Sequence, residues 1–264
     1  MPRQLMEALG QTLEYPPSTL LDVPQYRPAR LGRWQLERGR PDQWVRGYFT
    51  GLQFVAENWV LYRNPHNFRE GKRRDIWMSI TPMERESLAH HAWWAEGTVV
   101  VAGLGMGLLL YNLAQNPRVT SITVLEREPA VVDLLQEATG FRTEWFSSGP
   151  PLRVLTTSAM DWKPDHQVHT LLVDIWPQIA HRDLVADTQT LQKRIIAKQV
   201  LSWGQELAFM RYVNRAALAP SRDSFQRWRL ETGVPWAGLE HDPDYVTRCL
   251  QALRQCRLAA SASR

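Results

Sequence analysis

The sequence predicts an α/β protein built on a doubly wound parallel sheet of five strands in the order 3-2-1-4-5. Between residues 97 and 203, short apolar runs alternate with helical segments, and the first apolar run ends in a glycine-rich turn. The chain has 264 residues, of which 44% are hydrophobic and 22% are charged. This is the composition of an ordinary globular protein. A small β region is expected before the sheet, and a helical tail after it.

The first 80 residues are expected to form an arm and a small β region. Seven of the 17 prolines fall before residue 76, and they predict that residues 1–33 are an extended arm rather than a packed element. Residues 34–80 contain the runs QWVRGYF, LQFVA and WVLYR. Aromatic and β-branched runs of this length are typical of antiparallel strands. Glu57 and Asn58 are candidates for a turn between the last two runs.

Residues 81–203 are predicted to hold the parallel sheet. A helix should start at Pro82, with Thr81 as its N-cap and Glu84 completing a capping box, and should end at Gly97. Strands buried on both faces are expected from the continuous apolar runs TVVVAG, SITVLE, LRVLTT, HTLLVDIW and KQVLSW. The helical segments between them supply right-handed crossovers, so these strands should be parallel.

Residues 204–264 are predicted to be helical throughout. The segment GQELAFMRYVNRAALA carries a broad apolar stripe that includes Leu207, Met210, Val213 and Leu218. The last strand of the sheet leaves an exposed edge, which natural proteins cover or pair. The stripe could cover that flank within one monomer, or it could pack against a second copy of the chain in a homodimer. Periodicity does not decide between these alternatives.

The strongest functional pattern is a glycine turn followed by an acidic residue at the end of the next strand. Residues 103–107 read GLGMG, directly between a predicted strand and a predicted helix. Glycines there let a ligand lie against the main chain. Glu126 ends the second strand, 19 residues after Gly107, where its carboxylate can accept both hydroxyls of a ribose. Together these features predict a nucleoside-binding site at the carboxyl edge of the sheet.

The segment VVVAGLGMG resembles motif I of class I S-adenosylmethionine-dependent methyltransferases, which share a Rossmann-like fold. The resemblance covers roughly residues 76–176. TVLERE looks like the second strand with the ribose-binding acid, TTSAMDW like the segment near the adenine, and LLVDIWP like motif IV. The β-rich lead-in also resembles the amino-terminal hairpins of the spermidine synthase group. The resemblance implies S-adenosylmethionine as cofactor and methyl transfer as the reaction.

The chain also departs from these families. Aminopropyltransferases carry an Asp inside the glycine turn, where this chain has Met106, so polyamine synthesis is not expected. Ser158 stands where the methyltransferases have an Asp near the adenine amino group, with Asp161 three residues later. The usual antiparallel strand pair at the end of the fold is not recognisable after residue 203.

The resemblance and the glycine turn together give a set of predicted site residues. Asp174, at the end of the fourth strand, is the candidate to orient or deprotonate the methyl acceptor, although it could instead contact the cofactor or cap the next loop. Trp176 could stack on the acceptor or the adenine, and Glu84 could hold an ammonium group if it does not serve only the capping box. The segment with Trp77 and Thr81 should lie over the cofactor's methionine end, as in the spermidine synthase group. The predicted cofactor-binding residues are Gly103, Leu104, Gly105, Met106, Gly107, Glu126, Arg127, Ser158, Ala159, Met160, Asp174 and Glu84; the predicted acceptor contacts are Trp176, Trp77 and Thr81.

Two other functional classes stay open. A dinucleotide-binding oxidoreductase is the first, although its fingerprint G-x-G-x-x-G/A needs a small residue at the position that Leu108 occupies. The second is a sensor or assembly protein that binds S-adenosylmethionine without transferring its methyl group. The methyl acceptor itself cannot be named from the sequence.

The composition also bears on metals, partners and location. The two cysteines, Cys249 and Cys256, are seven residues apart on one predicted helix, too far apart for a disulfide. The seven histidines form no zinc pattern, so no metal is expected. Basic residues are in excess in both flanks, yet no nucleic-acid motif accompanies them. Without a membrane-spanning run or a secretory signal, the chain is expected in the cytoplasm.

Overall fold

The computed structural model describes residues 20–64 and 75–262, and its centre is a five-stranded parallel sheet. The strands are β7 (Gly97–Ala102), β8 (Val119–Glu126), β9 (Leu152–Thr156), β10 (Thr170–Val173) and β11 (Gln199–Ser202). Their order, β11-β10-β7-β8-β9, confirms the predicted order with β7 at the centre. Val99, Val100 and Val101 of β7 are buried, as expected for a strand covered on both faces.

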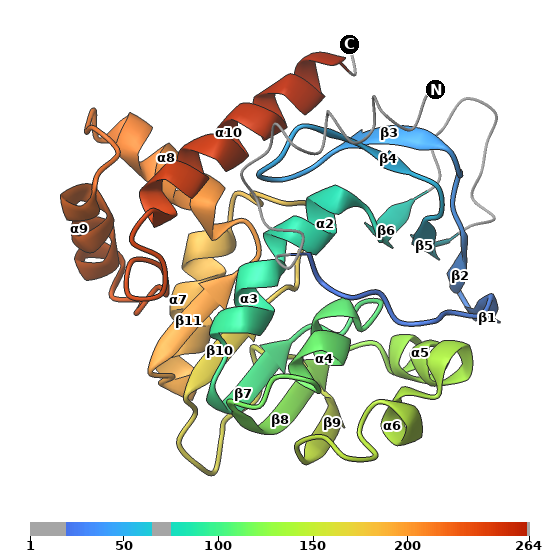
Figure 1. Ribbon diagram of the computed structural model, residues 1–264. Coiled ribbons are helices and arrows are strands. Elements are labelled where there is room, and N and C mark those ends of the chain that lie inside the picture. Colours follow the sequence, from blue (N-terminus) through green and yellow to red (C-terminus); the bar gives the residue numbers. More distant parts are fainter. Residues whose placement is uncertain (1–19, 65–74, 263–264) are drawn as a thin grey trace.

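Helices cover this sheet and connect its strands, except β9 and β10, which no helix joins (Figure 1). They are α4 (Leu108–Leu113), α5 (Pro129–Thr139), α6 (Phe141–Glu144) and α7 (Leu184–Ile195), preceded by α2 (Pro82–Ser87) and α3 (Ala89–Trp94). The sequence predicted one helix across α2 and α3. That helix is interrupted at Leu88, whose φ of −96° and ψ of −9° end α2 before α3 begins.

The N-terminal β region consists of two separate antiparallel sheets. Strands β1 (Ala29–Leu31), β2 (Trp34–Arg38), β5 (Trp59–Arg63) and β6 (Ile76–Ser79) form one sheet in the order β1-β2-β5-β6, and β3 (Gln43–Arg46) pairs only with β4 (Leu52–Val55). The hairpin expected at Glu57 and Asn58 is therefore not formed, because β4 and β5 belong to different sheets. Asn58 instead accepts the Ile80 N–H through its side chain.

Residues 20–28 form no helix or strand, and residues 29–33 form β1 and the turn after it. The segment packs against the core, so the expectation of an unpacked arm is wrong for this part. Leu21 is fully buried, and its carbonyl accepts from Arg85 Nε at 2.9 Å. The buried hydroxyl of Tyr26 donates to the Met106 carbonyl at 2.8 Å. These contacts attach the segment to α2 and to the glycine turn. The part of the predicted arm in residues 1–19 lies outside the described residues.

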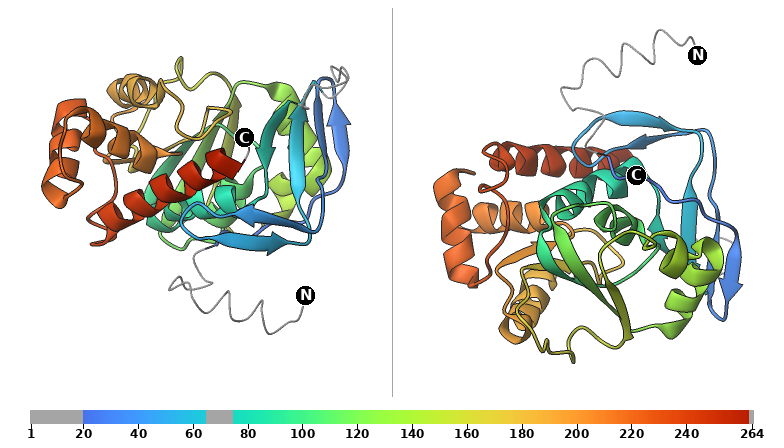
Figure 2. Two further views of the ribbon diagram at one scale, coloured as in Figure 1. Left: turned by 90° about the horizontal axis from the view of Figure 1, so that it is seen from above. Right: turned by 60° about the horizontal axis from the view of Figure 1, so that its bottom comes forward.

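The tail is helical, with α8 (Gln205–Arg215), α9 (Arg222–Thr232) and α10 (Tyr245–Ala262). The apolar stripe of α8 is buried within the chain itself: Leu207, Met210 and Val213 are each less than 10% exposed. Val200 of the edge strand β11 forms a bridge with Trp236, which covers that edge. Within the described residues, no antiparallel strand pair follows β11. Figure 2 shows α9 on the far side of the molecule from β1 and β2, whereas α10 runs toward the β3–β4 ribbon. There Arg46 donates to the side chain of Gln255 at 3.0 Å.

No helix among residues 20–64 and 75–262 combines the length and the hydropathy needed to cross a bilayer.

Candidate functional site

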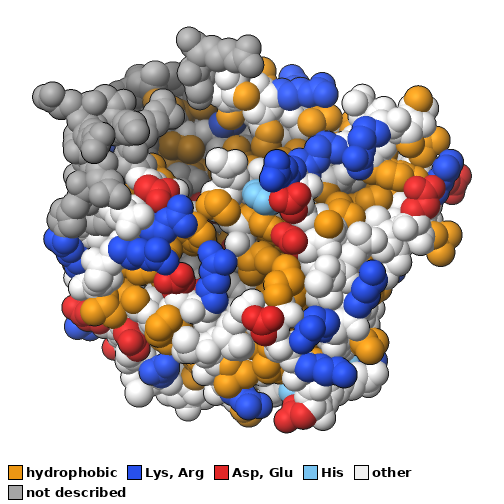
Figure 3. Space-filling view, turned by 180° about the vertical axis from the view of Figure 1, so that it is seen from behind, with side chains coloured by type: hydrophobic (Ala, Val, Ile, Leu, Met, Phe, Trp, Pro, Cys, Tyr) orange, Lys and Arg blue, Asp and Glu red, His pale blue; other side chains and the backbone are white. Residues whose placement is uncertain are grey.

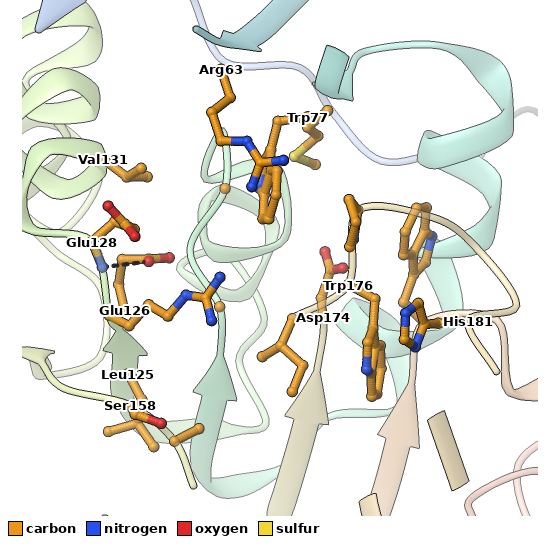
Figure 4. A pocket seen from close by; sticks show the side chains of 18 of the residues that line it. Arg63, Trp77, Leu125, Glu126, Glu128, Val131, Ser158, Asp174, Trp176 and His181 are labelled. Carbon is orange, nitrogen blue, oxygen red and sulfur yellow. Dashed lines mark hydrogen bonds between the residues drawn. The ribbon is translucent and has the colours of Figure 1, made fainter. Parts of the chain in front are cut away.

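A pocket of about 420 Å³ opens where the carboxyl ends of β7, β8 and β10 meet the β2-β5-β6 sheet. It brings together eleven of the residues predicted for the site: Gly103, Gly105, Glu126, Arg127, Ser158, Ala159, Met160, Asp174, Glu84, Trp176 and Trp77. Leu104, Met106, Gly107 and Thr81 do not line it. Figure 4 shows the side chains converging from both sides of the cavity. One cavity can therefore hold a ligand in contact with most of the predicted segments.

The glycine turn is shaped by two close approaches of neighbouring segments. Gly103 has φ of +96°, and a Cβ there would collide with the carbonyl oxygen of Asp174. Gly105 has φ of +53°, and its Cβ would meet the Met78 sulfur at 2.8 Å. Only glycine fits both positions without strain. The turn thus presents bare main chain to the pocket.

Glu126 is fixed at the end of β8 by two backbone N–H groups. Its side chain accepts from Leu104 N at 2.9 Å through one oxygen and from Glu128 N at 2.9 Å through the other. The residue is only 9% exposed and lines the pocket. Each carboxylate oxygen can accept more than one hydrogen bond. The group is therefore oriented in advance to accept the two hydroxyls of a diol.

The turn at residues 158–160 forms another wall of the pocket. The Ser158 hydroxyl accepts from Met160 N at 3.2 Å, and the Ser158 carbonyl accepts from Asp161 N at 3.0 Å. These bonds shape the turn. Asp161 is absent from the lining, so Ser158, Ala159 and Met160 are the residues of this segment that a ligand can touch.

Two further carboxyl groups line the other side of the pocket: Glu84 is buried and Asp174 is half-buried. Burial, with nearby Asp174 as a smaller cause, raises the pKa of Glu84 to about 8, although hydrogen bonds from Ser79 favour the charged form. Burial, with Glu126 as a second cause, raises the pKa of Asp174 to about 7. Both groups can thus carry a proton near neutral pH.

The predicted capping box at Thr81 is formed only in part. Thr81 occupies the N-cap position of α2, but its side chain makes no cap hydrogen bond. Glu84 instead accepts from the Ser79 N–H at 2.8 Å and from the Ser79 hydroxyl at 3.0 Å. A backbone hydrogen bond from Thr81 also favours its charged form. Glu84 therefore ties β6 to α2 while its carboxyl lines the pocket.

Aromatic side chains wall the same half of the pocket. Trp176 is buried, its Nε1 donates to Asp187 at 2.8 Å, and its ring stacks on His181 with 6.3 Å between centroids. Trp203 Nε1 donates to the Ser87 hydroxyl at 2.8 Å. These bonds hold the indole rings in fixed orientations, so rigid aromatic faces lie beside the two carboxyl groups.

The residues that roof the pocket were not predicted from the sequence. Trp34 and Arg63 face each other across the β2–β5 pair. Arg33 precedes Trp34 and forms an ion pair with Glu128 at 2.7 Å. Only the antiparallel register brings these side chains over the parallel sheet. The other lining residues that were not predicted include Glu128, His181, Asp187 and Trp203.

The surface charge is mixed on the face seen from behind in Figure 3. Among the side chains coloured there, Lys and Arg are interspersed with Asp and Glu instead of forming one continuous basic tract.

No protein-family model and no curated protein matches the chain. Several solved structures are similar to part of it. The N-methyltransferase NodS from Bradyrhizobium japonicum is 12% identical, covering 38% of this chain and 50% of NodS with a TM-score of 0.28. A putative RNA methyltransferase from Pyrococcus horikoshii is 20% identical, covering 47% and 60% with a TM-score of 0.34. A mycolic acid cyclopropane synthase is 16% identical, covering 44% and 43% with a TM-score of 0.32. The chain thus spans about half the length of these proteins, and similarity this low assigns no activity.

Proposed function

We propose that this chain is an S-adenosylmethionine-dependent methyltransferase. The observation that carries the proposal is the carboxylate of Glu126, held by two backbone N–H groups beside the glycine turn in a pocket of about 420 Å³. In this position the carboxylate would accept both ribose hydroxyls. The adenine would then lie along Ser158, Ala159 and Met160, and the methionine part would cross the turn toward Asp174.

The glycine turn favours S-adenosylmethionine over a dinucleotide. A dinucleotide places its pyrophosphate on free N–H groups at the start of the helix. Here the Met106 N–H contacts the Met78 sulfur at 3.3 Å, and the Gly107 N–H donates to the Leu104 carbonyl at 2.9 Å. Neither residue lines the pocket. A ligand without phosphates suits such a site better.

Asp174 supports an enzymatic function. S-adenosylmethionine supplies a methyl group on a sulfonium, which is already a good leaving group. Asp174, with a pKa of about 7, would take the proton that the acceptor's nitrogen or oxygen loses as it gains the methyl group. Trp77, Trp176 and Trp203 would exclude water and position the acceptor.

The finer assignments remain proposals on the same basis. The roof of antiparallel strands supports a place near the spermidine synthase group, and Met106 in the glycine turn argues against aminopropyl transfer. The acceptor is unidentified, and cytoplasmic location is an expectation from the sequence.

Isothermal titration calorimetry with S-adenosylmethionine, S-adenosylhomocysteine and NAD tests the proposal. We expect both adenosyl compounds to bind with one site per chain and NAD to give no heat of binding. Binding of NAD without S-adenosylmethionine would favour an oxidoreductase and end the proposal. Transfer of a labelled methyl group to a component of cell extract then separates an enzyme from a protein that only binds the cofactor.

A further inference from the structure

We propose that Arg63 binds the α-carboxylate of S-adenosylmethionine and so selects this compound over its decarboxylated form. The inference rests on the proposed function, because it assumes that the adenosine part lies at Glu126. It adds a residue of the N-terminal β region to the cofactor site.

A chain of contacts holds Arg63 above the glycine turn. The Met78 sulfur lies against Gly105 and receives the Met106 N–H at 3.3 Å. Trp77, its neighbour in β6, lines the pocket. The guanidinium of Arg63 lies 4.6 Å from the centroid of the Trp77 ring. In Figure 4 this guanidinium hangs beside Trp77, above the gap between Glu126 and Asp174. A ligand that runs from Glu126 across the turn passes beneath it.

The hydrogen bonds of Arg63 leave the required donors available. Its Nε–H donates to Asp75 at 2.8 Å, which fixes the plane of the guanidinium. Among the described residues, none accepts from its two terminal nitrogens. Two terminal N–H groups in one plane match the two oxygens of a carboxylate. The cation is thus oriented but not fully neutralised.

The charges in the rest of the pocket leave no comparable place for a ligand carboxylate. Arg33 is paired at 2.7 Å with Glu128, which lines the pocket two residues after Glu126, whereas Asp75, the partner of Arg63, does not line the pocket. Arg127 directly follows Glu126, so it belongs to the ribose end of the site. Five acidic side chains also line the pocket: Glu84, Glu126, Glu128, Asp174 and Asp187. In its charged form each would repel a ligand carboxylate, so it could lie next to one only when protonated. Arg63 is therefore the cation that the methionine end would meet.

This arrangement predicts discrimination between two closely similar ligands. Decarboxylated S-adenosylmethionine keeps the adenosine, the sulfonium and the ammonium, but it lacks the group that Arg63 would bind. A site built to pair with a charged group loses that interaction when the group is missing. The chain should therefore prefer the carboxylated compound.

Calorimetry on the full chain tests the role of Arg63 with three ligands: S-adenosylhomocysteine, decarboxylated S-adenosylmethionine and 5′-methylthioadenosine, which lacks the methionine chain. We expect Arg63→Gln to lower the affinity for S-adenosylhomocysteine about tenfold or more, because a charged hydrogen-bonding partner is lost. Binding of the other two ligands should change less than about twofold. Arg63→Lys should retain part of the affinity for S-adenosylhomocysteine. The control Arg30→Gln, at an exposed residue outside the pocket lining, should leave all three affinities unchanged.

The ligand without a methionine chain separates recognition from a damaged pocket. If Arg63→Gln lowered the affinities for S-adenosylhomocysteine and 5′-methylthioadenosine equally, Arg63 would only support the shape of the pocket. That result would overturn the inference. Unchanged binding of S-adenosylhomocysteine would overturn it as well. If the wild-type chain bound neither of these two ligands, the proposed function would fail, and the inference with it.

Discussion

At the scale of single residues, burial determines the charge of the groups beside the proposed reaction centre. Asp174 ends β10 in a cavity with Glu126 nearby, and its pKa is raised from 3.8 to about 7. A carboxyl group with this pKa can accept a proton near neutral pH. The same shift makes the free energy of unfolding depend on pH.

The stability effect of Asp174 has a definite sign. Its pKa is higher in the folded chain than in the unfolded chain, so its contribution is fully present below about pH 3.8 and is lost as the pH rises through about 7. Asp174→Asn removes this charge. We expect the free energy of unfolding of the variant to exceed that of wild type by about 1 kcal/mol or more at pH 8, and to be close to that of wild type at pH 4.

Urea denaturation at the two pH values measures this difference. Asp133→Asn, which changes an exposed carboxyl group outside the pocket, is the matched control. An Asp174→Asn variant that is no more stable than wild type at pH 8 would show that the charged form of Asp174 does not destabilise the folded chain.

Glu126 provides the second prediction at this scale. Glu126→Gln removes the charge that would accept the ribose hydroxyls, and we expect it to cost about 1.5–3 kcal/mol of S-adenosylhomocysteine binding. The amide oxygen can still accept one of the N–H groups of Leu104 and Glu128. The fold should therefore persist in circular dichroism, and Glu137→Gln on the exposed side of α5 should bind like wild type. If the Glu126 variant bound S-adenosylhomocysteine as tightly as wild type, the ribose would not contact Glu126.

At the scale of elements, one buried carboxylate anchors the β3–β4 ribbon to the core. Glu86 of α2 is 2% exposed and accepts from Phe49 N at 2.6 Å and from Thr50 N at 3.1 Å. Both donors lie in the turn between β3 and β4. Without the carboxylate, two buried N–H groups would lose their partner.

Glu86→Ala should therefore lower the free energy of unfolding by about 3 kcal/mol. It should also speed amide hydrogen exchange at Phe49 and Thr50, because the turn would open locally. Glu57→Ala is the control. That residue makes an exposed ion pair with Arg38 at 3.4 Å, which is worth at most about 1 kcal/mol. Similar losses in the two variants would contradict the anchoring role of Glu86.

At the scale of the whole molecule, the C-terminal helices complete the core. The rings of Trp228 and Trp236 stack with 4.7 Å between centroids, and Phe209 packs against Trp228. The Val200 N–H donates to the Pro235 carbonyl, which covers the edge of β11. A chain that ends after Trp203 would expose this edge and a large apolar surface.

We expect that truncated chain to aggregate or to remain unfolded, while the full chain is soluble at micromolar concentration. Light scattering and circular dichroism measure both properties. A truncated chain that stays folded and monomeric would disprove the covering role of the tail.

The homodimer remains a prediction. The apolar stripe of α8 that suggested it is buried within one chain. Any self-association would therefore use another surface, and the same light scattering on the full chain measures the oligomeric state.

The parallel sheet, the glycine turn and the position of Glu126 follow from the amino-acid sequence alone. These features are local: a buried strand is a continuous apolar run, and a tight turn needs glycine where φ is positive, as at Gly103 and Gly105. The end of each parallel strand then places its acidic residue at the same edge. The strand pattern is therefore enough to assign Asp174 and Glu126 to one site.

What closes the site depends on tertiary pairing between distant strands. The aromatic runs of the N-terminal region do not alternate regularly, and β2 pairs with β5, more than twenty residues away, rather than with its neighbour β3. That pairing places Trp34 and Arg63 over the pocket. It also separates β4 from β5, where the sequence suggested a hairpin. Register between distant strands depends on which faces become buried together, and the composition of a single strand does not encode its partner.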